Sequence, residues 1–258
     1  MKMQRIVRKA VMSLAVLLAV STLLFPVSSE ADMVPSNILQ RVFALRLGTQ
    51  QATGFTIEVD GRQYLITARH LLLSSKTLTD IEILHNGRWV KVSFRVILPE
   101  LDTVDIAVLA LPQQLSTLLP IQLGIKSSYL SQEVFFVGFP YGLFIDRKAL
   151  NSGFPLPLVK HGIIAAFANE RGEPFLVDGI NNPGFSGGPV VNASTAANPT
   201  IIGVVSGYRA VQEPVRNQDQ DTNMHVAVNT GLLVAYGIEY AVEAIKKNPI
   251  GFRVQPDP

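Results

Sequence analysis

The stretch that decides the fold is "NNPGFSGGPVV", residues 181–191, in which glycines and a proline surround Ser186. A packed core needs no such run of glycines, but a tight loop does, because glycine lacks Cβ and adopts dihedral angles closed to other residues. Gly184 and Gly187 would also leave open the face from which a carbonyl group could approach the serine. Ser186 is therefore either a turn residue or a nucleophile held on a loop.

Two upstream segments contain the groups that a serine nucleophile requires. In "YLITARHLL" His70 follows a predicted strand, and in "TVDIAVLALP" Asp105 precedes an apolar run, with Asp102 as a second candidate. A serine hydroxyl is a weak nucleophile until a base takes its proton, and a carboxylate must fix the tautomer of that base. Each residue alone is typical of a structural role, but together they supply a nucleophile, a base and a carboxylate.

Most of the chain consists of short apolar or alternating runs broken by Gly, Pro, Asn and Asp. The dipeptides Asp60-Gly61 and Asn86-Gly87 are typical of tight hairpin turns, so the pattern predicts antiparallel β structure. Two β-rich halves are expected, joined near residues 112–124. Helical spacing of apolar residues is found only in "TGLLVAYGIEYAVEAIKKN", which predicts a C-terminal helix over about 230–247.

The segments "TARH", "DIAVL" and "GFSGGP", in this order, resemble the three signature segments of chymotrypsin-like serine peptidases, which have the trypsin fold. The segments "NPGFSGGP" and "KHGIIAA" are most similar to the bacterial HtrA/Deg-type branch. The resemblance implies an all-β chain with two antiparallel six-stranded β-barrels, at about 37–118 and 123–236, and a C-terminal helix. It also implies a serine endopeptidase that acts on polypeptides without a cofactor.

The resemblance assigns roles to the candidate residues. His70 would be the general base and acid, Asp105 the orienting carboxylate and Ser186 the nucleophile. The N–H groups of Gly184 and Ser186 would form the oxyanion hole, an arrangement that the glycine-rich loop also favours. The strand "GVVSGY" would place Ser206, Gly207 and Tyr208 where a substrate adds as an antiparallel strand.

The chain departs from the family pattern at several positions. Phe185 stands beside the nucleophile, where digestive members have Asp and Deg-type members often have Asn; it either packs under the oxyanion loop or narrows the site. Ile180, at the expected base of the substrate pocket, favours small or medium apolar residues over Lys or Arg. His225 could face that pocket and favour an acidic residue instead. No peptide-binding PDZ domain is expected after the catalytic domain.

The N-terminus resembles an export signal. Four basic residues precede position 10, residues 10–27 are uncharged, and Ser29-Glu30-Ala31 offers a cleavage site. An uncleaved membrane anchor is the alternative, since 18 residues are just enough to span a bilayer. The expected location is the bacterial periplasm or the extracellular medium, with membrane contact only through this segment.

Charge and composition exclude several other classes. Residues 32–258 hold 18 basic and 19 acidic residues, a net charge of about −1, so nucleic acid is not an expected partner. The chain has no cysteine, and a domain of this size can bury a stable core without disulfides. His85 and His161 lack neighbours at ligand spacing, so no metal is expected. "NAS" at Asn192 is a glycosylation acceptor only in a eukaryotic secretory route.

Two competing interpretations use the same residues. The first is an α/β-hydrolase esterase, because residues 184–188 fit Gly-x-Ser-x-Gly and the order Ser186, Asp219 or Asp221, His225 matches that fold. It requires alternating strands and helices, which the sequence pattern does not show. The second is a binding protein on the peptidase scaffold with gated or inactive chemistry, an idea that Phe185 raises and the intact triad residues oppose.

Overall fold

The computed structural model describes residues 33–73, 80–167, 171–192, 199–217 and 220–254. The chain divides into two units, Met1–Ala31 and Asp32–Pro258, and every described residue belongs to the second. The predicted export signal, with its cleavage site and its alternative as an anchor, lies outside the described residues. Among the described residues, no helix is both long and apolar enough to cross a membrane.

The first half of the described chain forms one sheet, in the order β5-β4-β1-β2-β3-β7-β6, with β15 added to β3. All of its strand pairs are antiparallel. Its strands are β1 (Val42–Leu47), β2 (Gln50–Val59), β3 (Arg62–Thr67), β4 (Asp80–His85), β5 (Arg88–Ser93), β6 (Arg95–Ile97), β7 (Ala107–Ala110) and β15 (Phe252–Arg253).

Both predicted hairpin turns are confirmed. Asp60 and Gly61 have φ of 50° and 69° between the paired residues Val59 and Arg62. Asn86 and Gly87 have φ of 50° and 75°, again between directly paired residues. Positive φ at both central positions is the mark of the type I′ turn, whose twist matches that of the strands it joins.

The second sheet has the order β12-β9-β10-β11-β14-β13-β8, and an extra pairing of β12 with β13 closes it into a barrel. Only the short β8–β13 pair is parallel among the described strands of this sheet. Its strands are β8 (Gln122–Leu123), β9 (Glu133–Gly138), β10 (Leu158–Ala166), β11 (Phe175–Asp178), β12 (Pro189–Asn192), β13 (Thr200–Asn217) and β14 (Gln220–Gly237).

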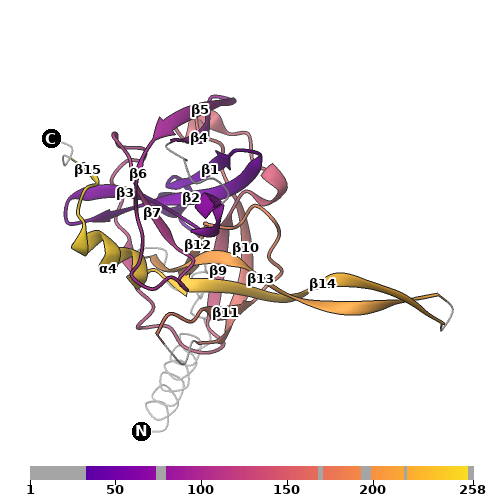
Figure 1. Ribbon diagram of the computed structural model, residues 1–258. Helices are drawn as coiled ribbons and strands as arrows, with labels where there is room; N and C mark the ends of the chain where they lie inside the picture. The colour runs from indigo at the N-terminus through magenta and orange to yellow at the C-terminus, as the bar shows by residue number, and fades with distance from the viewer. Residues whose placement is uncertain (1–32, 74–79, 168–170, 193–198, 218–219, 255–258) are drawn as a thin grey trace, which may run out of the picture. The chain divides into compact units, whose positions relative to one another are not determined.

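Short helices connect the strands, and one longer helix follows them. The short ones are α2 (Ser36–Leu39), α3 (His70–Leu73), η1 (Pro140–Gly142) and η2 (Lys148–Leu150). The predicted all-β fold of two barrel-like sheets followed by a C-terminal helix is confirmed (Figure 1), but among the described residues the sheets contain eight and seven strands and not six each. The described chain therefore lacks the alternating strands and helices that an α/β-hydrolase requires.

The C-terminal helix is shorter than predicted. Helix α4 spans Glu239–Lys247, whereas Thr230–Gly237, expected at its start, forms the end of β14. Within that strand Leu233 and Ala235 face the buried core of the second barrel and pair with β11. Apolar residues at this spacing fit a helix or a strand, and burial between two neighbouring strands favours the strand.

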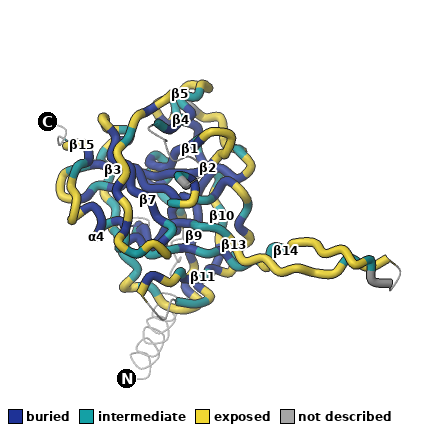
Figure 2. The backbone as a smooth tube through the Cα atoms, in the orientation of Figure 1, coloured by how far each residue is buried: buried dark blue, intermediate teal, exposed yellow. Residues whose placement is uncertain are grey.

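Strands β13 and β14 continue beyond the second barrel as a two-stranded arm. Their register extends from Ala210 opposite Asn229 to Asn217 opposite Gln220. Figure 1 shows this pair projecting from the body, and Figure 2 shows that its surface is largely exposed. Of this pair, the sequence predicts the strand "GVVSGY" (203–208) but no structure for residues 209–223.

Candidate active site

The first sheet brings His70 and Asp105 together. His70 is the first residue of α3, directly after β3, and Asp105 lies just before β7, which pairs with β3. The imidazole Nδ1 lies 2.7 Å from Asp105 Oδ2, and the backbone N–H of His70 donates to Asp105 Oδ1 at 2.7 Å. Two contacts on one carboxylate fix both the position and the orientation of the ring.

Asp105 has a third partner from the second barrel. The Ser206 hydroxyl donates to Asp105 Oδ2 at 2.5 Å. Burial raises the pKa of this carboxyl. The hydrogen bonds from His70 and Ser206, together with the charge of His70, lower the pKa by a larger amount, so it lies below its usual value of 3.8. Asp105 is therefore a carboxylate at neutral pH, as a partner of an imidazolium must be.

The loop before Ser186 is a tight turn with positive φ at glycine. The Phe185 N–H donates to the Asn182 carbonyl at 3.2 Å, and Gly184 within this turn has φ of 104°. A Cβ at Gly184 would collide with the Phe139 carbonyl, so the loop requires glycine there. Among the hydrogen bonds of the described residues, none uses the N–H of Gly184 or of Ser186. These two donors are available for an oxyanion.

Thr53, on β2, holds this loop from the other barrel. Its hydroxyl donates to the Gly184 carbonyl at 2.7 Å and accepts from the Phe139 N–H at 3.0 Å. Its backbone N–H donates to the Ser186 carbonyl at 3.0 Å. Thr53 is fully buried and fixes the carbonyls of Gly184 and Ser186, at the two ends of this segment. This role could not be predicted from the sequence, because an isolated threonine in a strand gives no signal.

Phe185 packs under the loop and does not narrow the site. Its side chain is fully buried in the core of the second barrel, where it meets Phe136 edge-on with ring centroids 5.1 Å apart. The Phe185 ring therefore anchors the segment between Gly184 and Ser186 by apolar burial.

Ser186 is connected to Asp105 through Ser206. The Ser186 hydroxyl donates to the Ser206 carbonyl at 2.9 Å. The described residues show no hydrogen bond between Ser186 and His70 in this conformation. One series of hydrogen bonds thus links Ser186 to Ser206, Ser206 to Asp105 and Asp105 to His70.

The predicted pocket residues Ile180 and Gly207 lie on neighbouring segments. The side-chain amide of Asn181, the residue after Ile180, donates to the Gly207 carbonyl at 2.8 Å, and Asn229 donates to the Asn181 carbonyl at 2.7 Å. The Ile180 and Tyr208 side chains are 60% and 40% exposed, so both face solvent at this surface.

Lys160, on β10, also contacts this wall and was not identified from the sequence. Its ammonium group donates to the Ile180 carbonyl and to the Asn182 side-chain oxygen, the latter at 3.1 Å. It lies 5.7 Å from the centre of the Phe136 ring, and burial lowers its pKa. A positive charge is therefore present beside Ile180.

The structure places other sequence candidates elsewhere. His225 pairs with Pro214 on the exposed arm, apart from Ile180, and Asp221 pairs with Arg216 farther out; Asp219 lies outside the described residues. The Asp102 side chain is 90% exposed and pairs with Arg69 at 2.8 Å, so the partner of His70 is Asp105 and not Asp102.

The other two histidines, His85 and His161, each contact a polar group. His85 meets the Ser152 carbonyl at 3.0 Å, and His161 lies 3.5 Å from Glu133. No group of three or more His, Cys, Asp or Glu side chains suited to a metal ion occurs in the described part of the chain.

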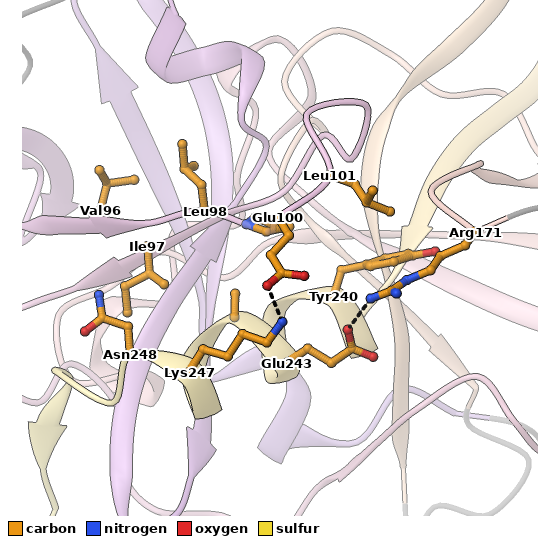
Figure 3. Close-up of a pocket in the computed structure, with 12 residues that line it drawn as sticks. Val96, Ile97, Leu98, Glu100, Leu101, Arg171, Tyr240, Glu243, Lys247 and Asn248 are labelled. Carbon is orange, nitrogen blue, oxygen red and sulfur yellow. Dashed lines mark hydrogen bonds and ion pairs between the residues drawn. The ribbon is translucent and has the colours of Figure 1, made fainter.

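A pocket of about 270 Å³ lies between residues 96–101 and helix α4, away from Ser186 (Figure 3). Two ion pairs cross it, Lys247 with Glu100 at 2.5 Å and Arg171 with Glu243 at 3.2 Å. The Lys247–Glu100 pair links α4 to residues 96–101, the segment that precedes Asp105.

Comparisons with known proteins agree with this fold. Among solved structures, a serine-to-alanine mutant of Rv3671c from M. tuberculosis H37Rv, in an inactive form, is similar in fold: TM-score 0.51, 15% identity, with 91% of this chain and 97% of that chain covered. The HtrA-type protease AlgW, a variant with a tripeptide, has TM-score 0.52 and 21% identity, with 83% of this chain and 62% of that chain covered.

At these identities the likeness concerns the fold alone. The comparison with curated proteins finds no match. A family model does match: the trypsin-like peptidase domain aligns with residues 52–197, more than half of the chain. That range contains His70, Asp105 and Ser186. The chain belongs to the trypsin-like peptidase domain family.

Proposed function

We propose that the protein is an exported serine endopeptidase that cleaves peptide bonds through His70, Asp105 and Ser186. One observation carries the proposal: the series of hydrogen bonds from Ser186 through Ser206 and Asp105 to His70, which joins the two barrels at the glycine-rich loop. Family membership supports a polypeptide substrate. The basic and apolar N-terminal pattern supports export to the periplasm or the medium.

The chemistry follows from the groups present. Ser186 Oγ attacks the substrate carbonyl carbon while His70 Nε2 takes the hydroxyl proton, and Asp105 stabilises the resulting imidazolium. The N–H groups of Gly184 and Ser186 bind the oxyanion. The C–N bond then breaks, and His70 returns the proton to the departing amine. Water, deprotonated by His70, hydrolyses the acyl-enzyme ester and restores the Ser186 hydroxyl.

Substrate binding would also redirect the Ser186 hydroxyl. In the free protein this hydroxyl donates to the Ser206 carbonyl. A substrate strand that pairs antiparallel with Ser206–Tyr208 would bring its own N–H to the same carbonyl. The displaced hydroxyl then needs another acceptor, and the neutral His70 Nε2 provides it. The nucleophile would thus be activated when a peptide occupies the strand.

The pocket would prefer apolar side chains to basic ones at the residue before the cleaved bond. Exposed Ile180 supports small or medium apolar residues. The ammonium group of Lys160, beside Ile180, opposes basic ones.

The test is labelling of the full chain with a fluorophosphonate probe, followed by mapping of the adduct. We expect a single adduct on Ser186, none in Ser186→Ala, and labelling slowed at least 100-fold in His70→Ala and Asp105→Asn. Circular dichroism of each variant controls for folding. If the well-folded wild-type protein is not labelled, the endopeptidase proposal is wrong and a gated or binding-only scaffold replaces it.

A further inference from the structure

The two-stranded arm, formed by residues 209–217 of β13 and 220–229 of β14, leaves one edge of β13 unpaired. Within the described residues, β14 is the only strand that pairs with β13 beyond Val204. The backbone groups on the outer edge of β13 therefore face solvent along the arm. An exposed strand edge readily pairs with another extended chain, and a lone two-stranded hairpin is only marginally stable in water.

The arm continues the strand that carries the proposed substrate-binding residues. Ser206, Gly207 and Tyr208 lie on β13, and the same strand runs outward to Asn217. A substrate antiparallel to β13 has its scissile bond near Ser186 and extends toward the tip of the arm with the residues that precede that bond. Its N-terminal part would thus continue along the open edge of the arm, past the register shift between Tyr208 and Ala210.

We infer that the arm is an extended binding edge for unfolded polypeptide substrates, pairing with residues that lie well before the cleaved bond. The inference rests on the proposed endopeptidase function. Pairing beyond Tyr208 requires an extended backbone as occupant, because the edge offers alternating N–H and C=O groups and not a closed pocket. A folded protein surface without a free strand cannot satisfy these groups, so the substrate class is the unfolded or locally extended chain.

Pro214 limits the length of this edge. Proline has no N–H to donate, so a ladder on β13 ends at or before it. The usable edge then runs from Ser206 to Glu213, about 26 Å at 3.3 Å per residue. A substrate would need about eight residues before the cleaved bond to occupy it fully.

One face of the arm also offers apolar contacts. Val211 is opposite Val228, and Glu213, two residues along the same strand, is opposite Val226, so these residues share a face. Val211 and Val226 are 45% and 49% exposed. A strand bound to the open edge of β13, with apolar residues at alternate positions, would pack directly against Val211, and Val226 lies on the same face one strand farther away. Such alternating sequences are typical of segments that are buried when a protein is folded.

The test compares the wild type with a variant in which residues 212–227 are replaced by Asn-Gly, a turn that suits the paired Val211 and Val228. Substrates are synthetic peptides with one cleavage site, chosen from a digest of reduced, carboxymethylated lactalbumin, and with 3, 5, 8 or 11 residues before the cleaved bond. For the wild type we expect kcat/KM to rise about tenfold from 3 to 8 residues and then level off. The trimmed variant keeps Ser206–Val211 of this edge, so we expect its rise in kcat/KM to stop at about 6 residues and the gain from 5 to 8 residues to be smaller than in the wild type.

A double variant tests the apolar face while the arm keeps its full length. Val211→Asp with Val226→Asp should reduce the gain with length, whereas the control pair Val90→Asp with Val96→Asp, equally exposed valines on β5 and β6, should not.

The outcomes separate this inference from the proposed function. Fluorophosphonate labelling of the trimmed variant at the wild-type rate shows that the catalytic groups are intact. If both proteins are labelled and show the same length dependence, the arm inference is wrong and the endopeptidase proposal stands. The same holds if the wild type is a dimer by light scattering, the trimmed variant is a monomer and the length dependence is unchanged, because the arm then serves self-association. Absence of labelling in the wild type overturns both.

Discussion

A buried carboxylate such as Asp105 must be kept ionised by its neighbours. Burial alone would raise its pKa, so the hydrogen bonds from His70 and Ser206 have to outweigh that effect. They arrive from different barrels, because Ser206 lies on β13 and His70 follows β3. The ionisation state of one residue therefore depends on the two halves of the molecule being docked.

The pH dependence of stability should reveal this. Because the pKa of Asp105 is lower in the folded state, its contribution is present above the unfolded pKa, near 3.8, and is lost as pH falls through the folded pKa. We expect the difference in free energy of unfolding between wild type and Asp105→Asn to be largest at pH 6–7 and to shrink below pH 4. Urea unfolding at several pH values measures it. A difference that stays constant down to pH 2 would contradict the role of these hydrogen bonds.

The proposed catalytic residues had the clearest signal in the sequence. His70, Asp105 and Ser186 stand in short segments whose composition reflects a chemical need, and the structure brings His70 and Asp105 into contact. Thr53 and Lys160 were missed because each depends on contacts with residues far away in the chain. The sequence of one strand does not reveal such distant partners.

Among the elements, β2 also contributes to the second barrel, because Thr53 donates hydrogen bonds to the carbonyls of Gly184 and Ser186 in the loop of the proposed oxyanion hole. Replacing Thr53 with valine keeps the shape but leaves the Phe139 N–H and the Gly184 carbonyl without this buried partner. We expect Thr53→Val to lose about 1–3 kcal/mol of stability. We also expect kcat to fall about tenfold or more with little change in KM, since an oxyanion donor would be displaced.

Thr53→Ser is the matched control, since it retains the hydroxyl. Its kcat should stay near that of the wild type even if its stability falls through the lost methyl group. Equal losses of kcat in the serine and valine variants would show that Thr53 acts by packing alone. Steady-state kinetics on one peptide substrate and urea denaturation separate the two effects.

Elements were predictable where local chemistry decides them. The Asp60-Gly61 and Asn86-Gly87 turns depend on residues that tolerate positive φ, and both form as expected. The start of α4 was misplaced because Thr230–Gly237 has apolar residues at a spacing that fits either a helix or a strand. The arm was missed because Pro214 and its polar neighbours are typical of a loop, and only the register with β14 shows that they form a strand.

At the scale of the whole molecule, Arg41 joins distant parts of the chain. Its fully buried guanidinium donates to the Thr56 carbonyl at 2.9 Å, to Glu58 at 3.0 Å and to the Leu119 carbonyl, in the connection between the barrels, at 2.6 Å. A buried cation is favourable only when its donors are matched in this way.

Arg41→Met should therefore destabilise the protein by about 3–5 kcal/mol, because Glu58 and the two carbonyls lose their donor. Urea denaturation measures the change. Lys91→Met is the control: its partner Asp80 is 4.0 Å away and the Lys91 side chain is 72% exposed, so no measurable change is expected. Similar results for the two variants would show that Arg41 does not hold the inter-barrel connection.

Strand β15 gives the molecule a particular order of assembly. Phe252 and Arg253 pair with β3, and Arg62 on β3 donates to the Gly251 carbonyl, 189 residues away in sequence. During synthesis the first sheet can therefore be completed only after β15 has emerged, long after its other strands. A chain threaded through a membrane with its N-terminus first would present an incomplete first barrel until residue 253 has passed. For the exported peptidase that we propose, the path of the backbone would thus separate secretion of the chain from completion of the active site.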